Sequence, residues 1–122
     1  MLLDSNIVIY AAQQEHVEVR RFIEAHRVSV SAITYVEVLG YHKLRPEARD
    51  LLADFFRSLP VWPVTVPVLD EAVRLRQARK LGLADSLIAA TALVRGLPLA
   101  THNTADFAWI ERLKVIDPLS GK

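Results

Sequence analysis

The chain has 122 residues, a net charge of +1 and 52% hydrophobic residues, which fits one folded domain over residues 1–122. It has no cysteine, which excludes disulfides, zinc–thiolate sites and cysteine nucleophiles. The sequence does not open with the basic stretch and long apolar run of a signal peptide. No apolar segment approaches the roughly 20 residues needed to cross a bilayer. We therefore expect a cytoplasmic protein.

Apolar periodicity and capping signals predict alternating strands and helices. In chain order, we expect a strand at 1–3, helices at 7–12 and 15–26, a strand at 28–30, helices at 32–43 and 46–59, a strand at 61–66, helices at 67–81 and 84–95, and strands at 98–100 and 114–116. This alternation favours an α/β sandwich with a mainly parallel sheet. Active sites of such folds lie at the carboxyl ends of the strands.

Several residues suggest where these elements begin and end. Ser31 is a favourable N-cap for the helix that follows it. Pro63 either weakens its strand or places it at a sheet edge, because proline has no N–H to donate. Gly82 and Gly96 are expected to end helices. The helix at 84–95 is apolar on nearly every side, which predicts that it is buried.

Four of the 14 acidic residues stand out by position. Asp4 and Asp106 follow predicted strands, Glu37 lies among apolar residues of a helix, and Asp85 opens the apolar helix. An ionised carboxylate in apolar surroundings is costly unless it is paired or bound to a metal. Most other acids, Glu71 included, are expected to be solvated.

Each of the four also has a structural interpretation. Asp4 could cap a helix, and Asp85 could complement a helix dipole. Glu37 could form an ion pair with an arginine, and Asp106 could be a turn residue or a cap. Taken together they favour a metal site, because Mg²⁺ and Mn²⁺ prefer oxygen ligands. One or two such ions can activate a water to hydrolyse a phosphodiester.

The segments around these acids resemble those of the PIN-domain ribonucleases, and among them the VapC-like toxins of type II toxin–antitoxin systems. They occur in the family's order and at similar spacing over essentially the whole chain. The segments are Met-Leu-Leu-Asp-Ser-Asn-Ile-Val-Ile-Tyr, Ser-Ala-Ile-Thr-Tyr-Val-Glu-Val-Leu-Gly, Leu-Ala-Asp-Ser-Leu-Ile-Ala-Ala-Thr-Ala-Leu and Leu-Ala-Thr-His-Asn-Thr-Ala-Asp-Phe.

The resemblance implies a PIN-like α/β/α sandwich and a Mg²⁺- or Mn²⁺-dependent endoribonuclease. Asp4, Glu37 and Asp85 match the family's acidic triad, and Asp106 matches a fourth, more variable acid. The residues that match supporting or substrate-positioning positions are Ser5, Asn6, Thr101, His102 and Asn103. His102 stands where the family often has arginine.

The resemblance also implies partners: an RNA substrate, a VapB-like antitoxin that blocks the acidic site, and a second copy of the chain in a homodimer. Aromatic residues of the helices between residues 15 and 59, such as Phe55, could line the antitoxin groove or a dimer face, although most are expected to fill the core.

Other functions stay open. An aspartyl-nucleophile phosphatase usually needs a second acid two residues after the first, and Asn6 occupies that position. A PIN-like module could also bind RNA or protein without cleaving it, although retention of all four acids argues against a decayed site. An α/β domain whose acids serve only as caps and ion pairs would require four coincidences.

Overall fold

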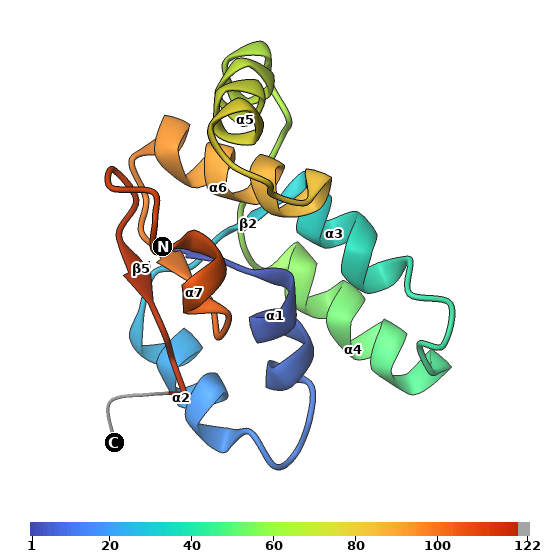
Figure 1. Ribbon diagram of the computed structural model, residues 1–122. Helices are drawn as coiled ribbons and strands as arrows, with labels where there is room; N and C mark the ends of the chain where they lie inside the picture. The colour runs from blue at the N-terminus through green and yellow to red at the C-terminus, as the bar shows by residue number, and fades with distance from the viewer. Residues whose placement is uncertain (120–122) are drawn as a thin grey trace.

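The computed structural model describes residues 1–119, so the last three residues of the predicted domain 1–122 lie outside this description. In chain order its elements are β1 (Leu2–Leu3), α1 (Ser5–Ala11), α2 (Val17–Ala25), β2 (Val30–Ser31), α3 (Ala32–Leu39), α4 (Pro46–Arg57), β3 (Val61–Trp62), α5 (Val66–Ala78), α6 (Leu83–Arg95), β4 (Leu99–Ala100), α7 (Thr104–Phe107) and β5 (Val115–Ile116) (Figure 1). No helix within residues 1–119 is long and apolar enough to cross a membrane.

The strands run parallel, as the sequence predicts. β4 pairs with β1 on one side and β5 on the other, and β2 pairs with β3. Backbone hydrogen bonds from Leu3 N to Ser29 O and from Ser29 N to Met1 O, both 2.9 Å, join the two groups. The resulting strand order is β3-β2-β1-β4-β5.

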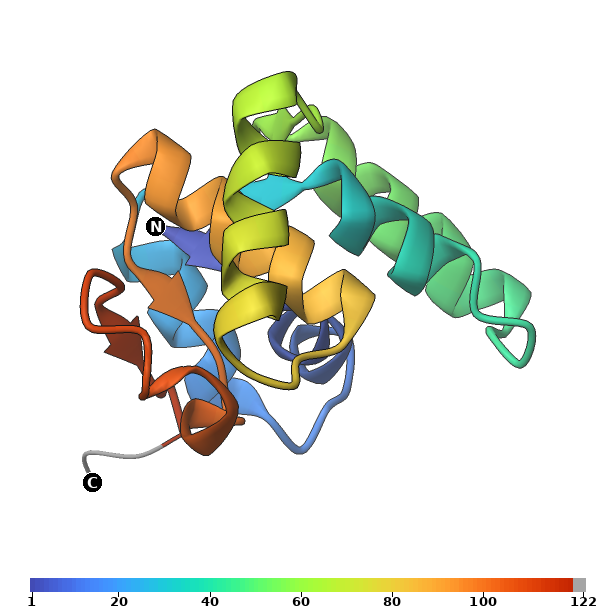
Figure 2. The ribbon, with the colours of Figure 1, turned by 45° about the horizontal axis from the view of Figure 1, so that its top comes forward.

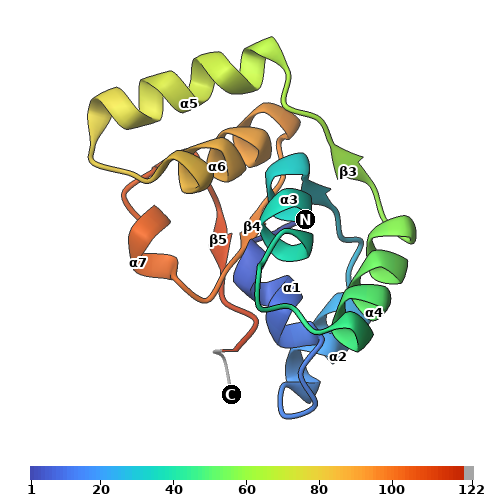
Figure 3. The ribbon, with the colours of Figure 1, turned by 90° about the vertical axis from the view of Figure 1, so that its right-hand side faces the viewer.

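Apolar side chains alternate between the two faces of these short strands. Leu2 and Leu99 face a core built with α5, α6 and α7. Leu3 and Ala100 face a second core built with α1, α2 and α4. Figure 3 shows α5 and α6 on one side of β4 and β5, with α1, α2 and α4 on the other. The expected α/β/α sandwich is confirmed.

Helices α3 and α4 form a hairpin that extends from the body of the molecule (Figure 2). The predicted N-cap is confirmed, because Ser31 Oγ accepts the Ile33 N–H at 3.1 Å. Helix α3 ends at Leu39, before the predicted 43, and Gly40 is its C-cap. The helix therefore stops soon after the turn that carries Glu37.

Other boundaries differ from the expectation. Gly96 ends α6 in a left-handed conformation (φ 66°), as predicted. Gly82 does not end α5; it is the N-cap of α6, while α5 stops at Ala78 and an extended Arg79 follows. Helix α7 was not expected. Helix α6 is only partly buried, since Leu83 and Val94 are exposed at its two ends.

Glu71 on α5 corrects another expectation, because it is buried rather than solvated, with 7% of its surface exposed. Its Oε1 accepts a hydrogen bond from Arg74 at 3.2 Å, and its Oε2 accepts one from Arg112 at 2.8 Å. The prediction failed because Arg112 lies 41 residues away along the chain.

Candidate active site

Asp4 lies where the chain leaves β1 and enters α1. It is 5% exposed. Its Oδ1 accepts the Ser5 N–H at 2.8 Å, so the carboxylate also caps α1. Its Oδ2 accepts the hydroxyl of Thr101 at 2.7 Å. Because β1 and β4 are parallel neighbours, Thr101, the residue after β4, reaches the residue after β1.

Burial is the main reason that the pKa of Asp4 is raised above its usual value. The hydrogen bonds from Thr101 and Ser5 oppose this effect, and the negative charges of Glu37 and Asp106 add to it. Asp4 is therefore a buried carboxylate whose charged neighbours are also acids.

Glu37 reaches Asp4's neighbourhood from α3. Ser5 Oγ donates to its Oε1 at 2.6 Å and lies 3.2 Å from Thr34 Oγ1. Glu37 is exposed, so it does not lie in the apolar surroundings that its neighbours in sequence indicate; Tyr41, four residues later, is exposed too. The sequence gives no sign of a role for Thr34, although this buried residue lies one helical turn before Glu37.

Asp85 lies in the first turn of α6 and is partly buried. Burial, followed by the charges of Asp4, Asp106 and Glu37, raises its pKa to about 6. Asp106 is exposed in the first turn of α7, shortly after β4. The structure thus brings Asp4 and Asp85 into electrostatic range of each other and of both Glu37 and Asp106, near the carboxyl end of the sheet.

The donor set fits a hard divalent cation in chemistry: it offers only carboxylate oxygens, and no ion pair within residues 1–119 neutralises any of the four. As they stand, no three carboxylate or imidazole groups of the described chain are arranged to enclose an ion directly. Intervening waters, which Mg²⁺ usually keeps, or rotation of the exposed Glu37 and Asp106 would complete the coordination.

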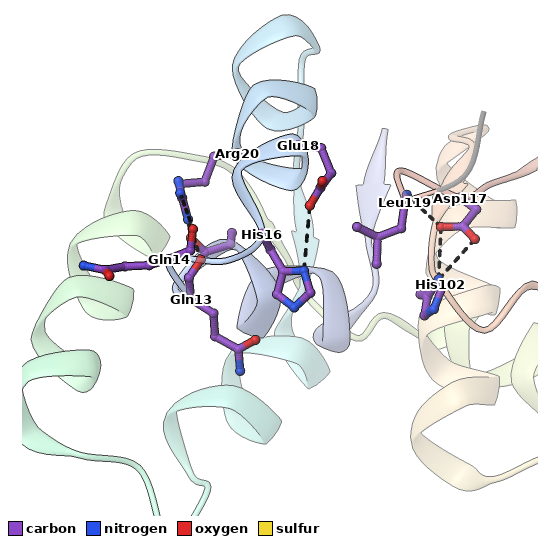
Figure 4. Close-up of polar contacts among 9 residues, drawn as sticks. Gln13, Gln14, His16, Glu18, Arg20, His102, Asp117 and Leu119 are labelled. Atoms are coloured by element: carbon purple, nitrogen blue, oxygen red, sulfur yellow. Dashed lines mark hydrogen bonds and ion pairs between the residues drawn. The ribbon is translucent and has the colours of Figure 1, made fainter. Parts of the chain in front are cut away.

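Of the expected supporting residues, Ser5 and Thr101 contact the acids directly, through Glu37 and Asp4 respectively. Asn103 acts through its backbone, whose N–H donates to Thr101 Oγ1 at 3.0 Å. His102 is turned instead toward Asp117, with its Nδ1 3.1 Å from the carboxylate (Figure 4).

The similarity of this chain to known proteins identifies its family. The PIN-domain family model matches residues 1–113. Ribonuclease VapC10 of Mycobacterium tuberculosis is 34% identical over 122 residues, which cover 93% of this chain and 90% of that protein. This chain is a VapC-like PIN domain. The tRNA(fMet)-specific endonuclease VapC of Shigella flexneri is 28% identical over 126 residues, 95% of this chain and 96% of the relative.

Solved structures show the same fold. A toxin–antitoxin complex from Klebsiella pneumoniae contains a chain similar to this VapC-like domain, with 30% identity, a TM-score of 0.82 and 98% coverage of both chains. DNA-bound VapBC from Salmonella typhimurium gives a TM-score of 0.84 at 23% identity, with 96% of both chains covered. The family and fold expected from the motifs are confirmed, whereas the roles of the individual site residues stay predictions.

Proposed function

We propose that residues 1–122 form a single PIN domain that serves as the toxin of a toxin–antitoxin pair, an endoribonuclease using Mg²⁺ or Mn²⁺. The observation that supports it most is the gathering of Asp4, Glu37, Asp85 and Asp106 without a paired cation. Burial, and after it the charges of Asp4, Asp106 and Glu37, raises the pKa of Asp85 to about 6. Such a group gains stability when a divalent cation replaces the missing countercharge.

The four acids would hold one or two ions. A bound cation would supply an activated water and offset charge on the scissile phosphate. Thr101 and the Ser5 N–H fix the orientation of Asp4, while the Ser5 hydroxyl fixes that of Glu37. The chain itself thereby orients the two carboxylates through neutral donors that leave their negative charge available.

RNA is the proposed substrate, because the relatives are a ribonuclease and a tRNA(fMet)-specific endonuclease. The cleaved RNA segment would be single-stranded, since its phosphates and bases are then accessible from more than one side.

A VapB-like antitoxin is the proposed partner, as the Klebsiella pneumoniae structure is a toxin–antitoxin complex. An apolar groove of about 440 Å³ between α1, α2 and α4, with Ile23, Leu51 and Phe55 in its wall, would receive an apolar helix face. Arg20 supports this region by donating to backbone carbonyls of the α1–α2 connection, including those of Gln13 and Gln14 (Figure 4). We also propose a homodimer.

The decisive experiment incubates antitoxin-free protein with total cellular RNA and Mg²⁺, Mn²⁺ or EDTA. The Asp85→Asn variant, purified identically, controls for contaminating ribonuclease. We expect discrete fragments that disappear with EDTA and with the variant. Equal cleavage by the parent and the variant would overturn the assignment, and a folded parent that binds metal without cleaving RNA would favour a non-cutting module.

A further inference from the structure

A second cavity, of about 560 Å³, opens beside two of the four acids, Asp85 and Asp106. Its lining includes Arg79 and Lys80, from the connection between α5 and α6, and Trp109. Cations and an indole therefore adjoin the proposed cleavage site.

The indole of Trp109 is held in place. Its Nε1 donates to the backbone carbonyl of Asp106 at 3.0 Å, and part of the ring packs against the core that contains Phe107. The guanidinium carbon of Arg79 lies 5.5 Å from the ring centroid. The ring is thus fixed by the segment that carries an acid of the site, and an exposed cation lies near its face.

The cations are also available. Neither Arg79 nor Lys80 forms an ion pair with any residue of the 1–119 segment. Arg76, in the last turn of α5, donates its Nε–H to the Leu81 carbonyl at 3.0 Å and so supports the connection that presents them. Two unneutralised cations beside the carboxylates of Asp85 and Asp106 reduce the repulsion that a polyanion would meet there.

We propose that this cavity binds the nucleotide next to the scissile phosphate of single-stranded RNA. This inference rests on the proposed nuclease function. The base stacks on the Trp109 indole, in the place where Arg79 now lies, and Arg79 and Lys80 contact the flanking phosphates. An unpaired base offers a free π-face for stacking, whereas a base in a duplex has both faces covered.

The two tryptophans of the chain allow a direct test. In an Asp4→Asn background, which prevents cleavage, Trp62→Phe leaves Trp109 as the only tryptophan. Titration with oligoadenylate of about eight residues should quench this fluorescence saturably, and an abasic ribose-phosphate oligomer of equal length should quench it far less. The matched Trp109→Phe variant, which reports from Trp62 near Arg95, should show no change.

Affinity gives the second readout, by fluorescence anisotropy of end-labelled oligomers. Trp109→Leu should weaken oligoadenylate binding by about ten- to a hundredfold and abasic binding by less than about twofold. Arg79→Gln should weaken both ligands alike and reduce the salt dependence. Equal losses for both ligands in Trp109→Leu, unchanged fluorescence on binding, or no oligoadenylate binding would overturn the subsite. Cleavage assays distinguish the two proposals. RNA cleavage by the parent without these effects of Trp109 would overturn the subsite and leave the nuclease assignment intact. Base-dependent binding at Trp109 without RNA cleavage by the parent would overturn the nuclease assignment.

Discussion

Asp4 and Glu71 are buried to nearly the same extent, 5% and 7% exposed, yet their pKa values move in opposite directions. Around Asp4, burial raises the pKa, and its donors, Thr101 and the Ser5 N–H, are neutral. Around Glu71, burial also acts to raise the pKa, but the hydrogen bonds from Arg112 and Arg74 outweigh it, and the pKa is lowered.

Burial alone therefore does not separate a structural carboxylate from a functional one. Glu71 carries its own countercharge, so it stabilises the fold and has no need of a cation. The Asp4 and Asp85 region has gathered negative charge without a countercharge, so its folding carries an electrostatic cost that a divalent cation would offset.

The largest expected effect is on cleavage. Asp4→Asn or Asp85→Asn should reduce the initial rate by about 1000-fold or more, because charge neutralisation by metal contributes several kcal/mol to such reactions. The matched control is Glu71→Gln, which neutralises a buried acid that already has its own countercharge. Its initial cleavage rate should stay within about twofold of that of the parent. The measurement is the cleavage rate of a fluorescent oligoribonucleotide in Mn²⁺. A comparable loss in Glu71→Gln would show that the rates report general damage.

The next effect concerns stability. Arg112→Ala should lower the free energy of unfolding by about 1–2 kcal/mol, a discounted value because the Arg112 side chain is 64% exposed. Urea unfolding measures the change. Since the folded pKa of Glu71 is lowered, its stabilisation is present above its usual pKa and is lost as pH falls through the folded value. The deficit of Arg112→Ala should therefore shrink toward pH 3; a constant deficit would mean lost packing alone.

Local signals allowed much of this to be predicted from the sequence. Asp4 directly follows its strand, Ser31 caps the helix next to it, and Gly96 ends α6 by adopting a left-handed backbone conformation. These features depend on residues a few positions apart, where apolar periodicity and capping chemistry decide the outcome. The four acids were identified because each lies in a recognisable segment.

Contacts between distant segments could not be predicted in the same way. Thr101 and Asp4 are 97 residues apart, and only the pairing of β4 with β1 brings the hydroxyl to the carboxylate. Glu71 looked like an ordinary helix-surface acid because nothing near it in the sequence indicates Arg112. The sequence places Glu37 among apolar residues, but Tyr35, Val36 and Glu37 are all exposed.

A smaller effect should appear in the metal-free protein. Asp85→Asn should raise the free energy of unfolding at pH 7 by about 1 kcal/mol, because it removes a partly buried charge from among three other acids. The folded pKa of Asp85 is raised to about 6, so the wild type loses this stability as pH rises from about 4 through 6. Urea unfolding in EDTA should show the gain vanish below pH 4. A destabilised variant at pH 7 would mean that Asp85 serves mainly the helix dipole of α6.

The smallest effect should come from Thr101→Val, which removes the hydroxyl donor to Asp4 and keeps the side-chain shape. Without that hydrogen bond the pKa of Asp4 should rise further, so protons compete better with the cation. We expect the apparent Mn²⁺ affinity, measured by calorimetry, to fall about threefold at pH 6 and less at pH 8. Thr91→Val is the matched control, since buried Thr91 donates to the Leu87 carbonyl within α6. A pH-independent loss, or an equal loss in the Thr91 variant, would mean that Thr101 maintains packing and does not tune the charge of Asp4.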